Sequence, residues 1–315
     1  MPSPTLPNNP KLGAAFVCAA CLFASTGDVA VKTLSGGYPI HQILATRCVL
    51  AFPILLAIVL RQTGLAALAT PHWPKVLLRS GALCLGFICF TLSIAAIPLA
   101  DAVAIYFTMP FFVAALSPLI LGERTPAHRW LAIACGFTGV IVMNGFSRGL
   151  LEPAVLLAVA SAFFYGTGQM LGRRYAQFIP VPVLAFYQNI FYLTVALLMA
   201  ALFLLLPENA GMHRSLAFLA HPWSMPSLAD SRLMVLVGIC ACGGMMLFAS
   251  AYKTAQASFV APFEYSGLVW ALIYGYCSFG DTPDLWMVTG AAIVVGAGIF
   301  MMRGERWFDT RSKAN

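Results

Sequence analysis

Charged side chains are scarce in this sequence. They make up 9% of the 315 residues, while apolar residues make up 60%. A typical soluble domain carries about a quarter charged residues, so this composition excludes an ordinary soluble protein. It instead predicts an all-α membrane protein whose main partner is the lipid bilayer.

Signatures of catalysis and of ATP hydrolysis are also absent. The apolar segments contain no HExxH motif, no GxSxG motif and no pair of aspartates, and the chain has no Walker A loop. It also lacks a filter-like loop of the kind that channels use. An intramembrane enzyme is therefore a less favoured alternative, and neither a cofactor nor a metal is expected.

The nine cysteines do not indicate a disulfide framework or a metal centre. All of them lie in apolar segments, where a free thiol behaves as a small packing residue. Cys18 and Cys21 have CxxC spacing, but neither a second pair of ligands nor a nearby histidine accompanies them. We therefore interpret both as packing residues.

Ten apolar segments are long enough to cross about 30 Å of hydrocarbon as helices of roughly 20 residues. The longest connections lie at 61–75 and 207–232, and the second contains Trp223, a residue type that is common at membrane interfaces. The predicted spans are 12–34, 40–60, 76–97, 100–121, 128–146, 151–172, 181–206, 233–253, 257–279 and 284–302.

Lysine and arginine are distributed unevenly between the two sides of these spans. If the amino terminus is cytoplasmic, 13 of the 18 basic residues fall on the cytoplasmic side. Positive charge in short loops marks the cytoplasmic side of a membrane protein. We therefore predict a multi-pass protein of the cytoplasmic (inner) membrane with both termini in the cytoplasm. Membrane topology explains the surplus of basic residues, so no nucleic-acid partner is expected.

The first and second halves of the sequence match each other at several positions, and the matches occur in the same order. At an offset of 141, Asp28 meets Gln169 and Arg47 meets Gln188. Because five helices are an odd number, the second copy of such a unit enters the membrane from the opposite side, which gives an inverted-topology repeat. The predicted units are 12–146 and 151–303, followed by a tail at 304–315. At an offset of 157 the matches are Gly86 with Gly243, Ser93 with Ser250, Pro126 with Pro283, and Gly139 with Gly296.

Two motifs carry a resemblance to a known family. Met-Pro-Phe-Phe at 109–112 leads to Leu-Gly-Glu-Arg-Thr-Pro at 121–126, and Ala-Pro-Phe-Glu-Tyr at 261–265 leads to Phe-Gly-Asp-Thr-Pro at 279–283. The chain thereby resembles the drug/metabolite transporter superfamily, of the EamA type with two modules. Asp281 stands where that family usually has Glu, and repeat two has no Arg matching Arg47. The resemblance implies a secondary transporter; relatives move amino acids, vitamins, nucleotide-like metabolites and drugs.

Ionisable side chains inside the spans are the first candidates for a transport site. Each costs at least about 2.5 to 3.5 kcal/mol in hydrocarbon unless it has a partner or a wet cavity. Asp28 and Arg47 both lie about 10 Å below the outer surface, since they are a few residues from the outer ends of consecutive helices. This predicts an ion pair between them, with Lys32 as a rival partner for Asp28. Arg47 either ties the two helices together or binds a substrate carboxylate or phosphate.

Glu264 lies within the ninth predicted span with no evident opposite charge at its depth. A carboxyl group in a low-dielectric medium binds a proton more readily, so Glu264 and Asp28 are candidates for proton coupling or for binding a substrate ammonium. The alternative for Glu264 is a cavity-lining side chain that hydrogen-bonds to neighbouring helices. Pro110 and Pro262 are predicted to bend spans four and nine.

The remaining candidates for substrate contact are uncharged, and for the aromatic ones lipid-facing or packing positions are the alternative. Together these features predict a monomeric secondary transporter for a small organic metabolite, working by alternating access with proton coupling or exchange. The substrate is amino-acid-like, or an aromatic or heterocyclic metabolite such as a vitamin or S-adenosylmethionine; the alternative is a broad-specificity exporter of drugs or toxic metabolites. The uncharged candidates are Gln169, Gln188, Tyr106, Tyr165, Tyr187, Tyr265 and Trp270.

Overall fold

The computed structural model describes residues 9–120, 127–144, 152–203, 214–254 and 261–312, and within these ranges its regular structure is entirely helical. The prediction of an all-α protein is therefore confirmed for this part of the chain. The motif at 121–126 and positions 257–260 of the ninth predicted span lie outside the described residues.

The first half of the chain supplies five spans. The fourth is made of two helices, because the chain leaves the helical path at 107–108, just before Pro110. Proline has no backbone N–H to donate, so it is tolerated in the first turn of a new helix. The bend predicted at Pro110 is thus a break. The elements are α1 (Pro10–Leu34), α2 (Ile40–Gln62), η1 (Leu65–Leu68), α3 (Trp73–Ile94), α4 (Leu99–Tyr106), α5 (Met109–Ile120) and α6 (Ala127–Asn144).

The second half repeats this plan. Its fourth span is also discontinuous, because a 3-10 turn that contains Pro262 precedes a shorter α-helix. The last helix runs to Ser312, beyond the predicted start of a tail at 304. The elements are α7 (Pro153–Tyr175), α8 (Val181–Phe203), α9 (Arg214–Ala220), α10 (Leu228–Thr254), η2 (Ala261–Tyr265), α12 (Ser266–Phe279) and α13 (Leu285–Ser312).

The start of α10 corrects the sequence-based boundary. The helix begins at Leu228, five residues before the predicted start at 233, inside a polar segment. Ser227 explains the earlier start, because its hydroxyl accepts a hydrogen bond from the Asp230 backbone N–H over 3.1 Å and caps the helix. Hydropathy alone places the boundary at the first apolar residue and misses such a cap.

Length and composition agree with ten spans. Among the described residues, seven helical stretches are long and apolar enough to cross a membrane, with α4 and α5 acting as one of them. Two shorter apolar helices lie within α6 and α13, at Trp130–Met143 and Leu285–Phe300. The pair η2 and α12 completes the set.

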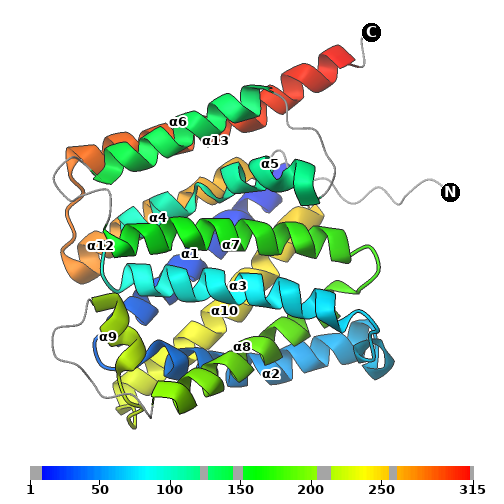
Figure 1. Ribbon diagram of the computed structural model, residues 1–315, viewed down its shortest axis with the longest axis vertical. Coiled ribbons are helices and arrows are strands. Elements are labelled where there is room, and N and C mark those ends of the chain that lie inside the picture. The colour runs from blue at the N-terminus through cyan, green and yellow to red at the C-terminus, as the bar shows by residue number, and fades with distance from the viewer. Residues whose placement is uncertain (1–8, 121–126, 145–151, 204–213, 255–260, 313–315) are drawn as a thin grey trace.

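The packing of the helices has the symmetry of an inverted repeat (Figure 1). The largest interfaces join α1 to α10, α3 to α7, α2 to α8, and α6 to α13. Helix α1 corresponds to α7 in the other repeat, and α10 corresponds to α3. The interface of α1 with α10 is therefore equivalent to that of α7 with α3. The α2–α8 and α6–α13 interfaces each join a helix to its own counterpart. The predicted pair of inverted five-helix repeats is therefore confirmed.

Glycines permit the close approach of the exchanged helix pairs. A Cβ atom on Gly86 of α3 would lie 2.9 Å from Cδ2 of Tyr165 on α7. A Cβ atom on Gly243 of α10 would lie 2.8 Å from Cδ1 of Phe23 on α1. Gly86 and Gly243, which match at an offset of 157, therefore serve the same interface in each repeat.

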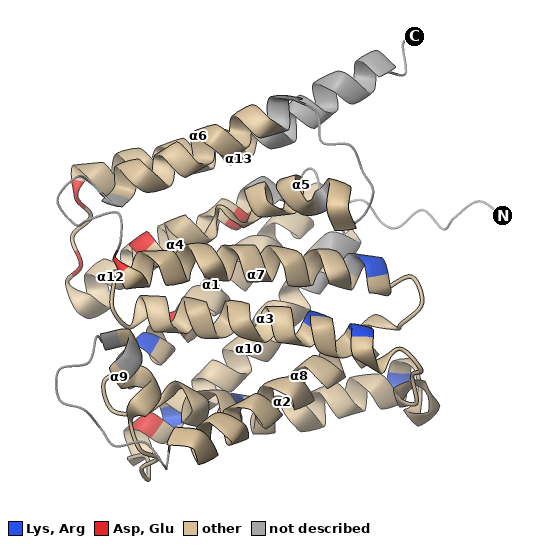
Figure 2. Cartoon of the chain, in the orientation of Figure 1, with Lys and Arg blue, Asp and Glu red and all other residues tan. Residues whose placement is uncertain are grey.

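The bundle has two end faces. The face that holds the end of α1 and the start of α2 is called the Leu34 face here, and the opposite face, where α3 begins, is called the Trp73 face. The acidic residues lie mostly at the Leu34 face, whereas Lys and Arg predominate at the Trp73 face (Figure 2). Helix α1 begins and α13 ends at the Trp73 face.

Candidate functional site

Arg47 projects from α2 onto an aromatic surface inside the bundle. Its Cζ atom lies 4.7 Å from the ring centroid of Phe87 on α3 and 5.9 Å from that of Tyr192 on α8. The guanidinium forms no hydrogen bond with a described residue, and none of its nitrogen atoms is fully buried. Its flat face is therefore covered by rings, while its N–H donors stay available to a ligand or to water.

Asp28 is the second ionisable group in this region of the bundle. It is half-buried on α1, and its electrostatic neighbours are Arg47, Tyr106 on α4, Tyr165 on α7 and Cys240 on α10. Four other helices thus surround its carboxylate, which makes no hydrogen bond to a described residue.

The predicted ion pair between Asp28 and Arg47 is wrong. Both side chains are described, but they do not come within the 4.0 Å that defines an ion pair. The two groups remain electrostatic neighbours, but Arg47 stacks on Phe87 and Tyr192 instead of pairing with Asp28. Depth along a helix, which the sequence supplies, does not determine which neighbours a side chain contacts.

Tyrosine rings fill the region between the two charges and the break in the fourth span. Tyr106 and Tyr165 meet edge to face, with ring centroids 5.4 Å apart and an interplanar angle of 90°. Beyond the break, the rings of Phe107 and Tyr265 lie 4.9 Å apart. The break at 107–108 therefore turns two consecutive rings, those of Tyr106 and Phe107, toward different partners in the second repeat.

Glu264 in η2 is half-buried and approaches the same tyrosines. It interacts electrostatically with Tyr106 and Tyr265, and its backbone carbonyl accepts a hydrogen bond from the Cys21 thiol over 3.4 Å. Asp28 and Glu264 are thus the two carboxyl groups that act on Tyr106, one from each repeat.

Other predicted candidates lie elsewhere. The Tyr187 hydroxyl donates a hydrogen bond to the Leu68 carbonyl, at the connection between α2 and α3. Trp270 packs beside Val17 and Phe248. Gln169 is exposed on α7, so the repeat partner of Asp28 does not occupy an equivalent buried place.

Arg79 on α3 was missed by the sequence-based search. Its Nη1 atom donates a hydrogen bond to Oε1 of Gln188 over 3.0 Å, and its Nε atom is buried without a partner. No carboxylate of a described residue pairs with it. Arg79 lies within the predicted span 76–97 but close to its cytoplasmic end, where a basic side chain is expected to mark topology, although the match of Arg47 with Gln188 pointed to this region.

Comparison with known proteins decides the family. The sequence profile described as "EamA-like transporter family" matches residues 11–145 and again 152–303. The chain belongs to the EamA-like transporter family. The two matched segments cover most of the chain, so the assignment holds for both repeats of this EamA-like protein.

The curated relatives of this EamA-like protein are transporters. It is 33% identical over 248 residues to a riboflavin transporter from Rhizobium johnstonii, covering 78% of this chain and 76% of the relative. It is 26% identical to the pseudopaline exporter of Pseudomonas aeruginosa, covering 94% and 98% of the two chains. It is 25% identical to an S-adenosylmethionine uptake transporter of Rickettsia prowazekii, covering 90% of each chain.

A solved crystal structure shares the fold. It superimposes with a TM-score of 0.63 at 18% identity, covering 94% of this chain and 98% of the other. At this identity the likeness supports the architecture alone. The EamA-like protein is thus a multi-pass membrane transporter for small metabolites with the helical arrangement described above.

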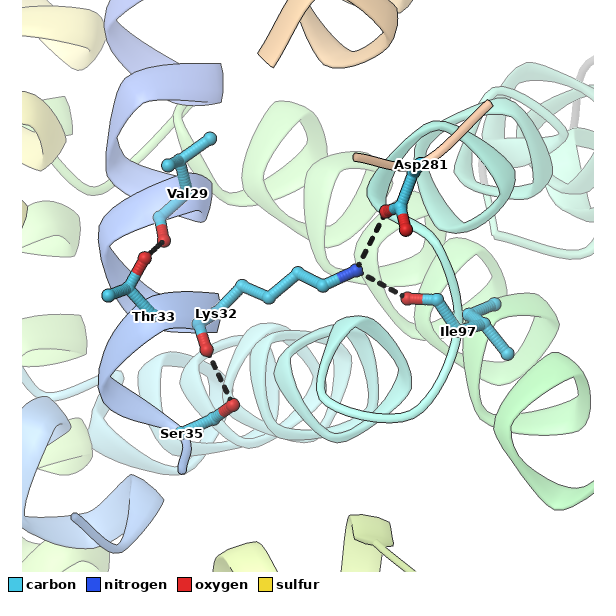
Figure 3. A network of polar contacts seen from close by, with 6 residues as sticks. All are labelled: Val29, Lys32, Thr33, Ser35, Ile97 and Asp281. Carbon is cyan, nitrogen blue, oxygen red and sulfur yellow. Dashed lines mark hydrogen bonds and ion pairs between the residues drawn. The ribbon is translucent and has the colours of Figure 1, made fainter. Parts of the chain in front are cut away.

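One ion pair ties the EamA-like bundle together at its Leu34 face (Figure 3). Lys32 extends from α1 to Asp281, with Nζ 3.4 Å from Oδ2, and also donates to the carbonyl of Ile97 over 2.9 Å. Its ammonium lies 4.8 Å from the ring centroid of Phe279. Lys32 is therefore the partner of Asp281 rather than of Asp28, and it links α1 to the α3–α4 and α12–α13 connections.

Proposed function

We propose that this transporter carries a flat organic metabolite with an anionic group through the space between Asp28, Arg47 and Tyr106. The observation that carries the proposal is Arg47, whose guanidinium is held against Phe87 and Tyr192 while its donors have no acceptor among the described residues. A planar guanidinium fork suits a carboxylate or a phosphate, and the neighbouring rings suit a flat group.

A heterocyclic substrate that also carries an anionic group, as S-adenosylmethionine does, fits this chemistry best. Relatives are a riboflavin transporter and an S-adenosylmethionine uptake transporter. Both compounds contain a flat heterocycle, but riboflavin has neither a carboxylate nor a phosphate for Arg47 to bind. Export of an amino-acid-like or toxic metabolite is the second candidate, because another relative is an exporter. Tyr165, Tyr265 and Gln188 are the further side chains that we assign to the path; Tyr187, Trp270 and Gln169 are assigned to its periphery.

Alternating access follows from the symmetry of the bundle. We assign the moving units to 12–146 and 151–303, because related interfaces such as α1 with α10 and α3 with α7 can open in turn. Helix breaks at 107–108 and at η2 lie beside the tyrosines and give each unit a joint. Transport by a monomer, without a chemical reaction, is the resulting activity.

Coupling to protons is assigned to Glu264 and Asp28, the two carboxyl groups that approach Tyr106. Orientation is assigned from charge: the Trp73 face, where Lys and Arg predominate, faces the cytoplasm (Figure 2). Both termini then lie in the cytoplasm, and the protein resides in the cytoplasmic membrane.

Flux into proteoliposomes tests the proposal. Purified protein is reconstituted, and uptake of radiolabelled riboflavin, S-adenosylmethionine and tryptophan is measured with and without an imposed pH gradient. We expect saturable uptake of at least one compound by the wild type and its loss in Arg47→Gln. Equal uptake by wild type and Arg47→Gln would contradict the role of Arg47. An uptake rate that is the same with and without the pH gradient would contradict proton coupling.

A further inference from the structure

A second arginine lies inside the bundle at a depth that mirrors that of Arg47. Arg47 is seven residues from the start of α2 at the Leu34 face, and Arg79 is six residues from the start of α3 at the Trp73 face. At 1.5 Å per residue both lie about 10 Å below their own face. Among the described side chains, each half of the bundle therefore contains one internal guanidinium of this kind.

Repeat symmetry brings the two arginines to equivalent places. The repeat partner of Arg47 is Gln188 on α8, and Gln188 is the residue that accepts the hydrogen bond of Arg79. The repeat partner of Arg79 is Leu236 on α10, so α10 carries no cation at the position that matches Arg79. Repeat two thus has Gln188 at the position that matches Arg47, and Arg79 on α3 of repeat one places a guanidinium beside it.

Arg79 carries the marks of a ligand-binding cation. Its Nη1 atom bonds to Gln188 and, over 3.5 Å, to the carbonyl of Leu184, but both acceptors are neutral. Its buried Nε atom has no acceptor, and no carboxylate of the described chain neutralises its charge. Gly172 leaves room for it, since a Cβ atom there would lie 2.8 Å from Nε. An unneutralised charge within a bilayer is expensive and marks a functional site.

Tyr192 connects the two arginines. Its ring lies beneath Arg47, and its hydroxyl is buried and interacts electrostatically with Arg79. That hydroxyl lies near Gln188, one turn earlier on α8, yet forms no hydrogen bond of normal geometry. A buried hydroxyl without a partner between two cations offers a donor to a passing anion.

We propose that Arg79 with Gln188 forms a second station for the anionic group of the substrate, equivalent to Arg47, and that the group passes Tyr192 between the two. The proposal rests on the proposed function and deepens it: the substrate carries a carboxylate or a phosphate, and each half of the path holds it in turn. Arg79 binds it toward the Trp73 face, and Arg47 binds it toward the Leu34 face.

Matched acid and amide probes test the second station by equilibrium binding to protein in nanodiscs. The pairs are nicotinate with nicotinamide, and indole-3-acetate with indole-3-acetamide, which share a ring and differ in charge. We expect wild type to prefer the acid of at least one pair. Arg47→Gln and Arg79→Gln should each lower that preference by about tenfold, the effect of losing one charge-assisted contact, and the double variant should abolish it.

Two further variants separate binding from folding. Arg79→Lys keeps the charge and should restore part of the acid preference. Gln188→Glu gives Arg79 a carboxylate partner, so it should lower acid binding while the thermal midpoint of unfolding is kept or raised. An unchanged acid preference in Arg79→Gln, or no acid preference in the wild type, would overturn the proposal. Flux of a neutral metabolite would still support the transport function itself, so the two failures are distinguishable.

Discussion

The Leu34 half and the Trp73 half of the bundle share one packing scheme but place their charges differently. In the Leu34 half, Arg47 comes from α2 and donates to no described residue, with Asp28 nearby. In the Trp73 half, Arg79 comes from α3 and already donates to Gln188, while the repeat partner of Asp28, Gln169, is exposed.

This comparison shows which features of a duplicated protein are retained and which diverge. The glycines that allow α3 to approach α7 and α10 to approach α1 are retained, because a side chain there would separate the helices. The positions that face the path are free to change, provided that some neighbouring helix supplies the charge. A position-by-position comparison of the two repeats therefore misses part of the symmetry of the site, because the equivalent cation comes from a different helix.

Removing the cation of the Leu34 half should have the largest effect. Arg47→Gln copies the residue found at the matching position of repeat two, and we expect transport to fall at least about tenfold because one charge-assisted contact is lost. Proteoliposome flux measures this at matched protein levels. Arg47→Lys should keep part of the activity, since the charge remains but the planar fork does not. Flux in Arg47→Gln within twofold of wild type would contradict the account.

Breaking the shared packing should come next. Gly86→Val places a side chain against Tyr165, and overpacking of this kind destabilises a protein by about 1 to 3 kcal/mol. Gly243→Val should do the same against Phe23 in the other repeat. Thermal unfolding in detergent compares both variants with Gly36→Val, where a Cβ atom would have nothing within 4 Å. Equal midpoints for all three variants would show that the glycines do not hold the helices together.

The two carboxyl groups beside Tyr106 offer a finer comparison. If Glu264 exchanges protons with the substrate path, Glu264→Gln should remove the stimulation of flux by a pH gradient, an effect of about tenfold or less. Asp28→Asn is the matched variant in repeat one. The initial rate of uptake is measured with and without the gradient. Stimulation that persists in both single variants would assign coupling to another group.

The ion pair at the Leu34 face should have the smallest effect on stability. Lys32 and Asp281 are 14% and 28% exposed, so their pairing should contribute no more than about 1 kcal/mol. A double-mutant cycle with Lys32→Met and Asp281→Asn measures the coupling through thermal midpoints. Arg174→Met, which removes a hydrogen bond to the Ile120 carbonyl at the Trp73 face, is the control. A coupling energy of zero would mean that the ion pair does not stabilise the contact between α1 and the α12–α13 connection.

Much of the fold could be predicted from the sequence because hydropathy and repeat matches report on it directly. Apolar length predicted the spans, and the ordered matches of glycine and proline predicted the inverted pair. The boundary at Leu228 was missed because the Ser227 cap is polar. The break at 107–108 was expected only as a bend, since the sequence shows Pro110 but not where the chain leaves the helix.

The site was harder to predict because it depends on the rotation of helices about their axes. Equal depth suggested a pair between Asp28 and Arg47, but the guanidinium stacks on Phe87 and Tyr192 and stays beyond ion-pair distance of the carboxylate. Arg79 was overlooked because its position near a helix start resembles that of a loop cation. Its role becomes visible only when α3 and α8 are placed together, as the hydrogen bond to Gln188 places them.

The central claim is that the space around Tyr106 is a transport path open in turn to both faces. The most direct measurement uses Tyr106→Cys in a chain whose nine native cysteines are replaced, labelled with a membrane-impermeant thiol reagent in right-side-out and inside-out vesicles. The account predicts that this cysteine reacts from either face. Labelling from one face alone, or from neither, would contradict it.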